Sequence, residues 1–324
     1  MRSFVRARCA LRTLALASTL AAKAAWADPS TTTTEQGFDL GEIQHPRSVA
    51  MGGARTALGS STNALYGNPA NLPLTRVYHF EGLAAWGPEA RRQSYGGAVV
   101  DSSTNRLAGG FGGTWSMLDP DRVRRQWSDL RLALAYPLVE RFSVGATGRY
   151  LHASQSVSTG ALGDSLVSGG TRGEAVVNTV TLDIGATLVP TDGLRIAAVG
   201  KNLSNPGHNI APTLLLAGVG YQTGIFSFEV EGLADFTTHG RAAGRFMAGA
   251  EIFLADHVPL RAGYRFDEAL KVHTISGGLG FVDRRWSVEL GVRRDVSGLH
   301  PSTLASLALR YFYDAGGADV GPDM

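Results

Sequence analysis

Charged side chains recur at every second position in several segments of this 324-residue chain, and they are the residues best able to do chemistry. In 226–236 the acidic residues alternate with phenylalanine and valine, and in 258–267 arginines alternate with apolar residues. Such charges can form a mutually neutralising ion-pair network, or they can line a polar binding site or conduction path. Their mixed signs argue against a strongly ion-selective pore. The candidate residues are Arg149, Arg195, Glu229, Glu231, Arg261, Arg265, Glu289 and Arg293.

Familiar catalytic motifs are absent from the sequence. It holds no G-x-S-x-G nucleophile elbow, no H-E-x-x-H, no Walker A motif and no G-x-G-x-x-G before a helix. The eight histidines are scattered with no pair at ligand spacing, and the single cysteine is Cys9. A serine and a histidine on neighbouring strands, as in a barrel lipase, would not show as a motif. We expect no enzymatic activity, no catalytic residue, no metal site and no cofactor.

The elements that carry these charges have a period of two from about residue 77 onward, which is typical of β-strands. We expect fourteen strands, near 77–87, 92–101, 105–116, 126–137, 141–154, 175–189, 193–203, 212–222, 225–237, 243–254, 257–267, 271–282, 285–296 and 302–313. The alternation has two interpretations. In a soluble β-protein the apolar face is the core, whereas in an outer-membrane barrel it meets lipid and the charged face lines the lumen.

Three observations favour the membrane barrel. The segments are about 10–14 residues long, near the length that a tilted strand needs to cross a bilayer. The gaps after even-numbered strands are all short, whereas several gaps after odd-numbered strands are longer, as in barrels with short turns on one side and loops on the other. Aromatic residues recur near strand ends, where interfacial girdles place them. We therefore predict an all-β, fourteen-stranded antiparallel transmembrane barrel.

The N-terminus has the features of a secretory signal peptide, residues 1–27. Four arginines precede an apolar run, and Ala25-Trp26-Ala27 is a small-x-small cleavage site. Cleavage removes five basic residues and no acidic one, so the formal net charge changes from +2 to −3. A negative net charge gives no indication of a nucleic-acid partner. The remaining chain has no apolar run of 18 residues, so it can enter a membrane only as a closed barrel. We divide it into a lead-in and plug (28–75), the barrel (76–314) and a C-terminal tail (315–324).

A short block before the first strand resembles a known signature. Met51-Gly52-Gly53-Ala54 is followed by Asn68-Pro69-Ala70-Asn71-Leu72, which is similar to the N-terminal "GGA…NPA-L" pattern of the FadL/PorV-like superfamily of outer-membrane barrels. Leu194–Leu203 resembles a strand of PorV-like proteins, and Leu260–Tyr264 resembles their "LRxGY" segment. The shorter PorV/PorQ-like branch is the closer fit. The resemblance implies a plug, or hatch, in the lumen, with Gly52, Gly53, Asn68, Pro69 and Ala70 as its motif and hinge.

The resemblance also implies two alternative functions in the outer membrane. The first is passive transport of small hydrophobic molecules, gated by the plug. In FadL-like transporters a kink in the third strand opens the wall to lipid, and Gly109, Gly110, Gly112 and Gly113 are candidates for such a wall kink. The second is a non-transporting barrel that docks secreted or surface proteins. A soluble periplasmic β-protein is a further alternative. The expected partners are outer-membrane lipid together with small hydrophobic ligands or secreted proteins.

Overall fold

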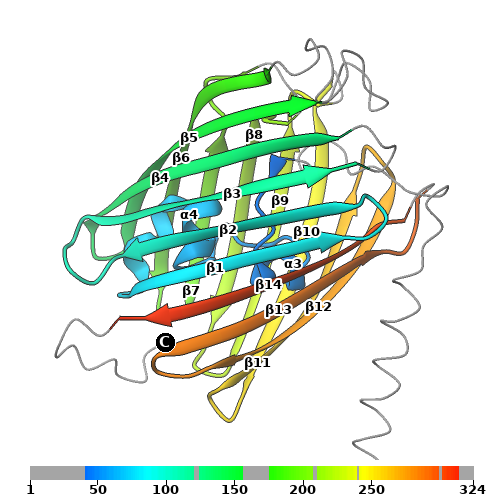
Figure 1. Ribbon diagram of the computed structural model, residues 1–324. Coiled ribbons are helices and arrows are strands. Elements are labelled where there is room, and N and C mark those ends of the chain that lie inside the picture. Colours follow the sequence, from blue (N-terminus) through cyan, green and yellow to red (C-terminus); the bar gives the residue numbers. More distant parts are fainter. Residues whose placement is uncertain are drawn as a thin grey trace, which may run out of the picture.

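The computed structural model describes residues 41–119, 124–155, 175–206, 210–238, 241–298 and 301–313. Within these ranges a closed antiparallel barrel of fourteen strands surrounds the N-terminal segment (Figure 1). The predicted fourteen-stranded barrel is therefore confirmed. The predicted signal peptide (1–27), residues 28–40 of the lead-in and the C-terminal tail (315–324) lie outside the described residues.

Each strand pairs with its neighbours in sequence, and β1 closes the barrel on β14 from His79↔Phe312 to Trp86↔Ala305. The elements are α3 (Pro46–Ala50), α4 (Thr62–Tyr66), the 3₁₀ helix η2 (Pro69–Leu74), β1 (Tyr78–Gly87), β2 (Arg92–Asp101), β3 (Ala108–Leu118), β4 (Arg125–Val139), β5 (Phe142–Gln155), β6 (Ala175–Thr191), β7 (Leu194–Lys201), β8 (Leu214–Gln222), β9 (Phe226–Asp235), β10 (Ala243–Leu254), β11 (Val258–Asp267), β12 (Val272–Val282), β13 (Trp286–Asp295) and β14 (Thr303–Phe312).

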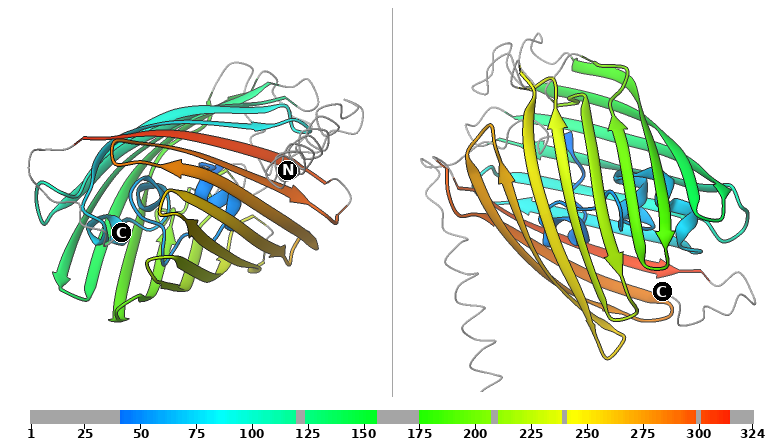
Figure 2. Two further views of the ribbon diagram at one scale, coloured as in Figure 1. Left: turned by 90° about the horizontal axis from the view of Figure 1, so that it is seen from below. Right: turned by 180° about the vertical axis from the view of Figure 1, so that it is seen from behind.

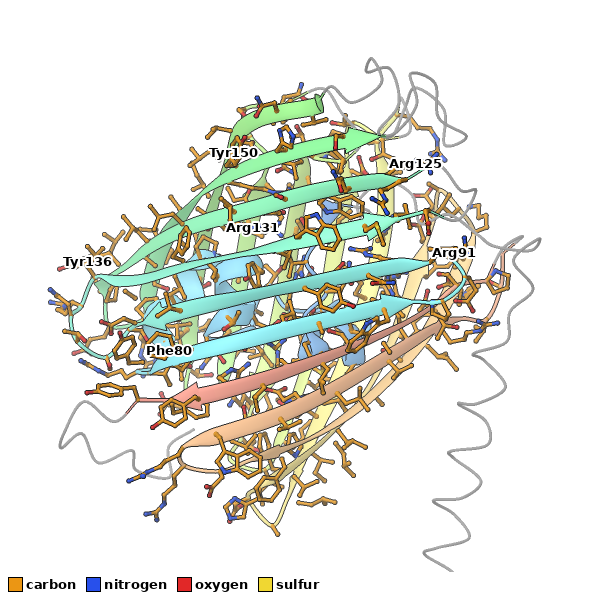
Figure 3. All side chains as sticks on the ribbon, in the orientation of Figure 1. Phe80, Arg91, Arg125, Arg131, Tyr136 and Tyr150 are labelled. Atoms are coloured by element: carbon orange, nitrogen blue, oxygen red, sulfur yellow. The ribbon has the colours of Figure 1, made fainter. Side chains whose placement is uncertain are left out.

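The alternation in the sequence becomes an apolar outer face and a charged inner face. In β9, Phe226 and Phe228 are exposed, whereas Glu229 and Glu231 are buried. Figure 3 shows side chains over the whole outer surface, and the exposed outer ones include large apolar and aromatic side chains on every strand. A polar lumen inside an apolar outer surface is the arrangement of a membrane barrel, and the reverse of a soluble barrel.

The turns have the predicted asymmetry except after β2, where residues 102–107 form a longer connection than predicted. Residues 140–141, 192–193 and 255–257 connect even-numbered strands to the next strand, while 202–213 form a long connection after β7. Ala255 and Asp256 both have positive φ, 50° and 61°, as a tight type I′ hairpin turn requires. β7 ends at Lys201, two residues before its predicted end, because Asn202 turns the chain out of the ladder with a φ of 54°.

The N-terminal segment, residues 41–75, crosses the lumen as a plug (Figure 2). α3 packs against β11–β14, α4 against β2–β4 and η2 against β3–β6. Glycines in the wall allow the close approach: a Cβ on Gly263 would lie 2.2 Å from the Gly52 nitrogen. Among the described residues, no helix is both long and apolar enough to cross a membrane.

Candidate functional site: the plugged lumen

The predicted lumen charges lie on the inner face of the wall. Arg149, Glu229, Glu231, Arg261, Arg265, Glu289 and Arg293 are all at most 7% exposed. Arg195, at the start of β7, is half-buried. Charges buried this completely need partners, because desolvation costs several kcal/mol per ion.

A chain of ion pairs, the wall belt, has one residue on each of five strands, β10, β11, β13, β14 and β1, and lies toward the short-turn end of the barrel. It runs from Glu251 to Arg261, Glu289, Arg310 and Glu81, with Arg261–Glu289 at 2.6 Å and Arg310–Glu81 at 2.7 Å. Two plug residues join it. His45 lies 3.2 Å from Glu81, and Arg47 lies 3.4 Å from Glu251. The wall belt therefore also holds the α3 end of the plug.

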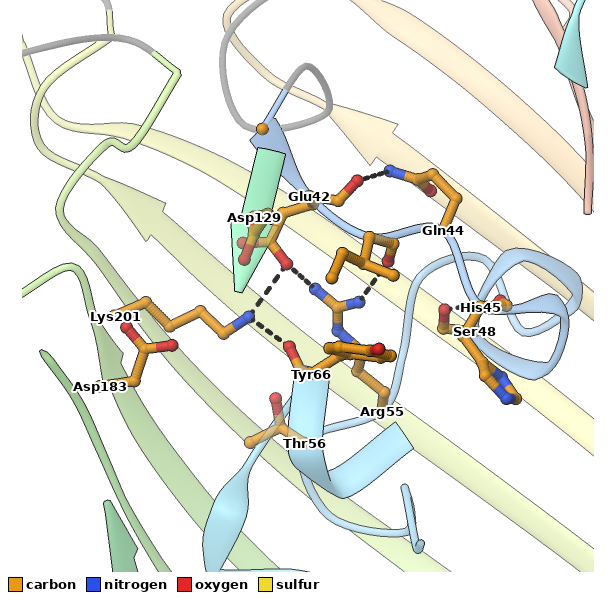
Figure 4. Close-up of polar contacts among 12 residues, drawn as sticks. Glu42, Gln44, His45, Ser48, Arg55, Thr56, Tyr66, Asp129, Asp183 and Lys201 are labelled. Carbon is orange, nitrogen blue, oxygen red and sulfur yellow. Dashed lines mark hydrogen bonds and ion pairs between the residues drawn. The ribbon is translucent and has the colours of Figure 1, made fainter. Parts of the chain in front are cut away.

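A second cluster surrounds Glu42, at the beginning of the described plug (Figure 4). One Glu42 carboxylate oxygen lies 2.6 Å from Arg55 and 3.1 Å from Lys201, and the other lies 3.7 Å from Arg131. Arg131 also binds Asp129 at 2.9 Å. The Lys201 ammonium and the Arg131 guanidinium donate to the Tyr66 carbonyl at 2.9 and 3.0 Å. This cluster links Glu42 and Tyr66 of the plug to Arg131 of β4 and Lys201 of β7.

The charges around Glu42 control its ionisation. Burial by itself would raise the pKa of Glu42, but Lys201, Arg131 and Arg55 outweigh it and hold that pKa well below the ordinary value of 4.5. Glu42 is therefore a carboxylate at neutral pH. Burial and the nearby Glu81 raise the pKa of the Tyr66 phenol, which stays protonated and donates to the Gly97 carbonyl.

The Asn-Pro-Ala-Asn motif forms a clamp within the plug. Asn68 caps η2 by accepting from the Ala70 nitrogen at 3.1 Å, and Pro69 occupies the first helical position. Asn68 and Asn71 both donate to the Thr56 carbonyl at 3.0 Å. Asn71 donates further to the carbonyls of residues 57 and 59. The motif therefore binds the backbone of residues 56–59, in addition to leading the chain into β1.

The glycines of β3 lie in an unbroken ladder. Gly109 to Gly113 pair continuously with β2 and β4, and the register shifts that occur lie at β4–β5, β5–β6 and β6–β7. Inside the barrel, a Cβ on Gly112 would lie 2.6 Å from the Tyr66 hydroxyl, and one on Gly110 would lie 3.5 Å from Leu65. In this structure two of the four glycines thus make room for α4, and a wall opening at β3 stays a prediction.

The loop end of the lumen, by contrast, is apolar. A buried cluster, here called the mouth cluster, consists of Ala90, Leu118, Trp127, Leu151, Ala153, Val177, Ile210 and Ala211. Leu151 follows Arg149 on the inner face of β5, and Trp127 precedes Asp129 on that of β4. The Arg92 guanidinium lies 5.5 Å from the centre of the Trp127 ring. The mouth cluster therefore lies directly beyond the Glu42 cluster.

The plug leaves little open space beside it. A cavity of about 20 Å³, lined by residues that include Glu42, Arg55 and Arg293, has room for about one water molecule. Among the described residues, no three His, Cys, Asp or Glu side chains form a group that could hold a metal ion. A solute larger than water does not fit in this cavity.

Sequence reasoning missed the plug's own contribution to this site. Glu42, Arg55 and Asn71 were not predicted as site residues, because they lie outside any periodic segment. The mouth cluster was missed as well, since apolar residues on a charged face look like gaps in the alternation. The break in the alternation at Leu151 and Val177 was the signal that could have found it.

No protein-family model and no curated protein matches this chain. Solved structures do match it in fold. The toluene transporter TbuX of Ralstonia pickettii is 16% identical with a TM-score of 0.61, over 85% of this chain and 100% of that one. The CymD monoaromatic hydrocarbon channel is 16% identical with a TM-score of 0.62, over 85% and 99%.

A FadL homologue of Pseudomonas aeruginosa is 13% identical with a TM-score of 0.59, over 86% of this chain and 100% of that one. At these identities the likeness concerns the fold, and it covers the barrel as a whole. The chain thus has the fold of the FadL-like outer-membrane barrels.

Proposed function

We propose that this protein is an outer-membrane barrel for the passive transport of small hydrophobic molecules, with residues 41–75 as the gate. The observation that carries the proposal is the mouth cluster. An apolar cluster at the loop end of the lumen, beyond the buried ion pairs, favours solutes that leave water readily, since apolar burial drives their binding. Structures of the same fold are named as toluene and monoaromatic hydrocarbon carriers, which supports this class of substrate.

The arrangement favours transport by stages. A hydrophobic solute first enters the mouth cluster, beside Trp127 and Leu151. Below it, the Glu42 cluster and the plug fill the lumen, so passage requires that the plug move. The PorV/PorQ-like resemblance supports a docking role instead, and that alternative is the outcome if no solute passes.

Uptake of radiolabelled toluene by cells that express the protein tests the proposal. Leu151→Gln should lower the uptake several-fold, because it puts an amide into the mouth cluster. Thr181→Gln is the matched control, since it enlarges a buried luminal side chain on the neighbouring strand without removing apolar surface. Uptake no greater than in cells without the protein, while the barrel is folded in the outer membrane, would refute transport and favour docking.

A further inference from the structure

The middle of the plug is bound on both sides by its backbone. We name residues 54–60 the flap. The flap's N–H groups point to the wall: those of Arg55 and Thr56 both donate to Glu231 at 2.8 Å, and that of Ala57 donates to Glu229 at 2.6 Å. Its carbonyls point inward to the asparagine clamp described above. The flap is therefore a turn, closed by the Gly59 N–H on the Arg55 carbonyl at 3.0 Å, that lies between two β9 carboxylates and the Asn-Pro-Ala-Asn motif.

The two carboxylates have no comparable role in the ion-pair clusters. Glu229 is fully buried and Glu231 is 1% exposed. The closest cations on the plug are bound elsewhere, since Arg55 pairs with Glu42 and Arg47 pairs with Glu251. The Arg195 guanidinium of β7 also faces Glu229. Among the described contacts, the backbone of the flap is what Glu229 and Glu231 hold.

Glycines on β8 and β10, the strands beside β9, leave space for the plug. Gly220 and Gly249 stand beside Glu229 in the ladder, and Gly218 stands beside Glu231. A Cβ on Gly220 would lie 2.3 Å from the Cγ of Leu58. Gly218 and Gly220 therefore leave space for the flap beside the two β9 carboxylates.

Unusual backbone conformations lie at both ends of the flap. Gly52 and Gly53 have φ of 72° and 102°. Ser61, a residue with a side chain, has a φ of 60° and a ψ of −128°, a sparsely populated conformation that stores strain. The parts beyond these points are fixed by other bonds: Ser276 donates to the Ala50 carbonyl, and Lys201 donates to that of Tyr66.

We propose that Glu229 and Glu231 form a catch, and that the flap is the part of the plug that leaves the wall when the lumen opens. Opening breaks the three N–H bonds to the catch, the Arg55–Glu42 ion pair and the asparagine bonds to the flap carbonyls. Residues 54–60 then turn about Gly52–Gly53 and Ser61, while α3 and α4 stay on the wall. The opening then lies along β8–β10. This inference rests on the proposed function in one respect only, that the lumen opens at all.

Ion conductance in planar bilayers tests the catch. The double variant E229A/E231A should raise the open probability on the order of tenfold, because three flap N–H groups lose their hydrogen-bond acceptors. E229Q/E231Q should raise it less, since an amide oxygen can still accept these bonds. D235A is the matched control: it removes a buried carboxylate of the same strand, which accepts from the Thr237 and Thr238 nitrogens outside the plug. Heat-modifiable migration on a gel verifies that each barrel is folded.

A disulfide lock provides an independent test that leaves the carboxylates in place. With Cys9 replaced by Ser, the pair Leu58→Cys and Gly220→Cys joins flap to wall at a separation that suits a disulfide. Oxidised protein should show conductance at least tenfold lower, and reductant should restore it.

Two results would overturn the catch: a folded E229A/E231A variant that conducts like the wild type or like D235A, or an oxidised lock that conducts normally. Toluene uptake measured on the same samples separates the two proposals. Uptake that persists with the lock closed refutes the flap as the gate and leaves transport standing.

Discussion

Glu42 offers the sharpest test of how the plug is held in the barrel. Its carboxylate is 4% exposed and lies within 3.7 Å of the cations of Arg55, Lys201 and Arg131. Glu42→Gln keeps the shape of the side chain and removes the charge, which leaves these cations without their shared counter-ion. Breaking a buried ion pair in this way costs about 3–5 kcal/mol. The equilibrium for docking of the plug's N-terminal part should therefore fall by roughly two to four orders of magnitude.

Limited trypsin digestion in detergent measures that equilibrium, since Arg47 and Arg55 are cleavable only when the plug undocks. Glu42→Gln should accelerate cleavage at both sites while the barrel itself stays intact. Lys201→Met removes one of the orphaned cations, so the double variant should be cleaved more slowly than the sum of the two single effects predicts. We expect a coupling of about 0.5–3 kcal/mol. Wild-type cleavage rates in Glu42→Gln, or strict additivity, would refute this account of the cluster.

The same residue predicts a pH dependence with a definite sign. The docked pKa of Glu42 lies well below its ordinary value of 4.5, so its contribution is fully present above about pH 4.5 and is lost as the pH falls towards the docked pKa. The Glu42 component of undocking should be absent above about pH 5 and appear in stronger acid. Because trypsin is inactive in acid, hydrogen exchange of the plug amides, corrected for the intrinsic rate at each pH, measures this component. In Glu42→Gln this component should be absent, so the difference between the two profiles isolates Glu42 from the other carboxylates.

Three further predictions concern the wall. Gly112→Ala should lower the free energy of unfolding by about 1–3 kcal/mol, because its Cβ would overlap the Tyr66 hydroxyl. A lower melting temperature reports this loss. Gly82→Ala is the control and should change little, since its Cβ has nothing within 4 Å. Leu132→Arg, on the lipid face of β4, should cost about 2–4 kcal/mol in urea unfolding from vesicles. Leu138→Arg, on the same face near the strand end, should cost about 0–1 kcal/mol, and equal costs would contradict the assigned membrane depth. The protein should fractionate with outer membranes, and recovery as a soluble periplasmic protein would refute the membrane assignment.

The strands were predictable because a wall between lipid and a charged lumen imposes a strict period of two on the sequence. β1 and β9 begin within one residue of their predicted starts. β3 begins at Ala108, three residues later than predicted, because a run of glycines shows no alternation that could fix its position. β7 was predicted too long because the left-handed turn at Asn202 leaves no mark on the hydrophobic pattern.

The interior was less predictable than the wall. Period two indicated which charges point inward, yet it could not pair them, since Glu42 and Lys201 are 159 positions apart in sequence. The resemblance pointed to Asn68-Pro69-Ala70 as a hinge, but the clamp also needs Asn71 and the backbone carbonyls of residues 56–59, which no side-chain motif encodes. The β3 glycines show the same limit, because a sequence cannot distinguish a kink from a space for Tyr66.

The chemistry of the plug interface bears on whether this barrel can open. An apolar interface would expose hydrocarbon to water on opening, at about 25 cal/mol per Å². Here the interface around Leu65 and Leu72 is apolar, whereas α3, Glu42 and the flap are held by ion pairs and by backbone bonds to carboxylates. The groups of this polar part regain hydration when the plug leaves. Because the desolvation penalty already offsets much of the attraction in buried pairs, separating both sides into water costs far less than deleting one partner. We therefore expect the polar network to fix the closed position of the plug and still permit its release, as a gate requires.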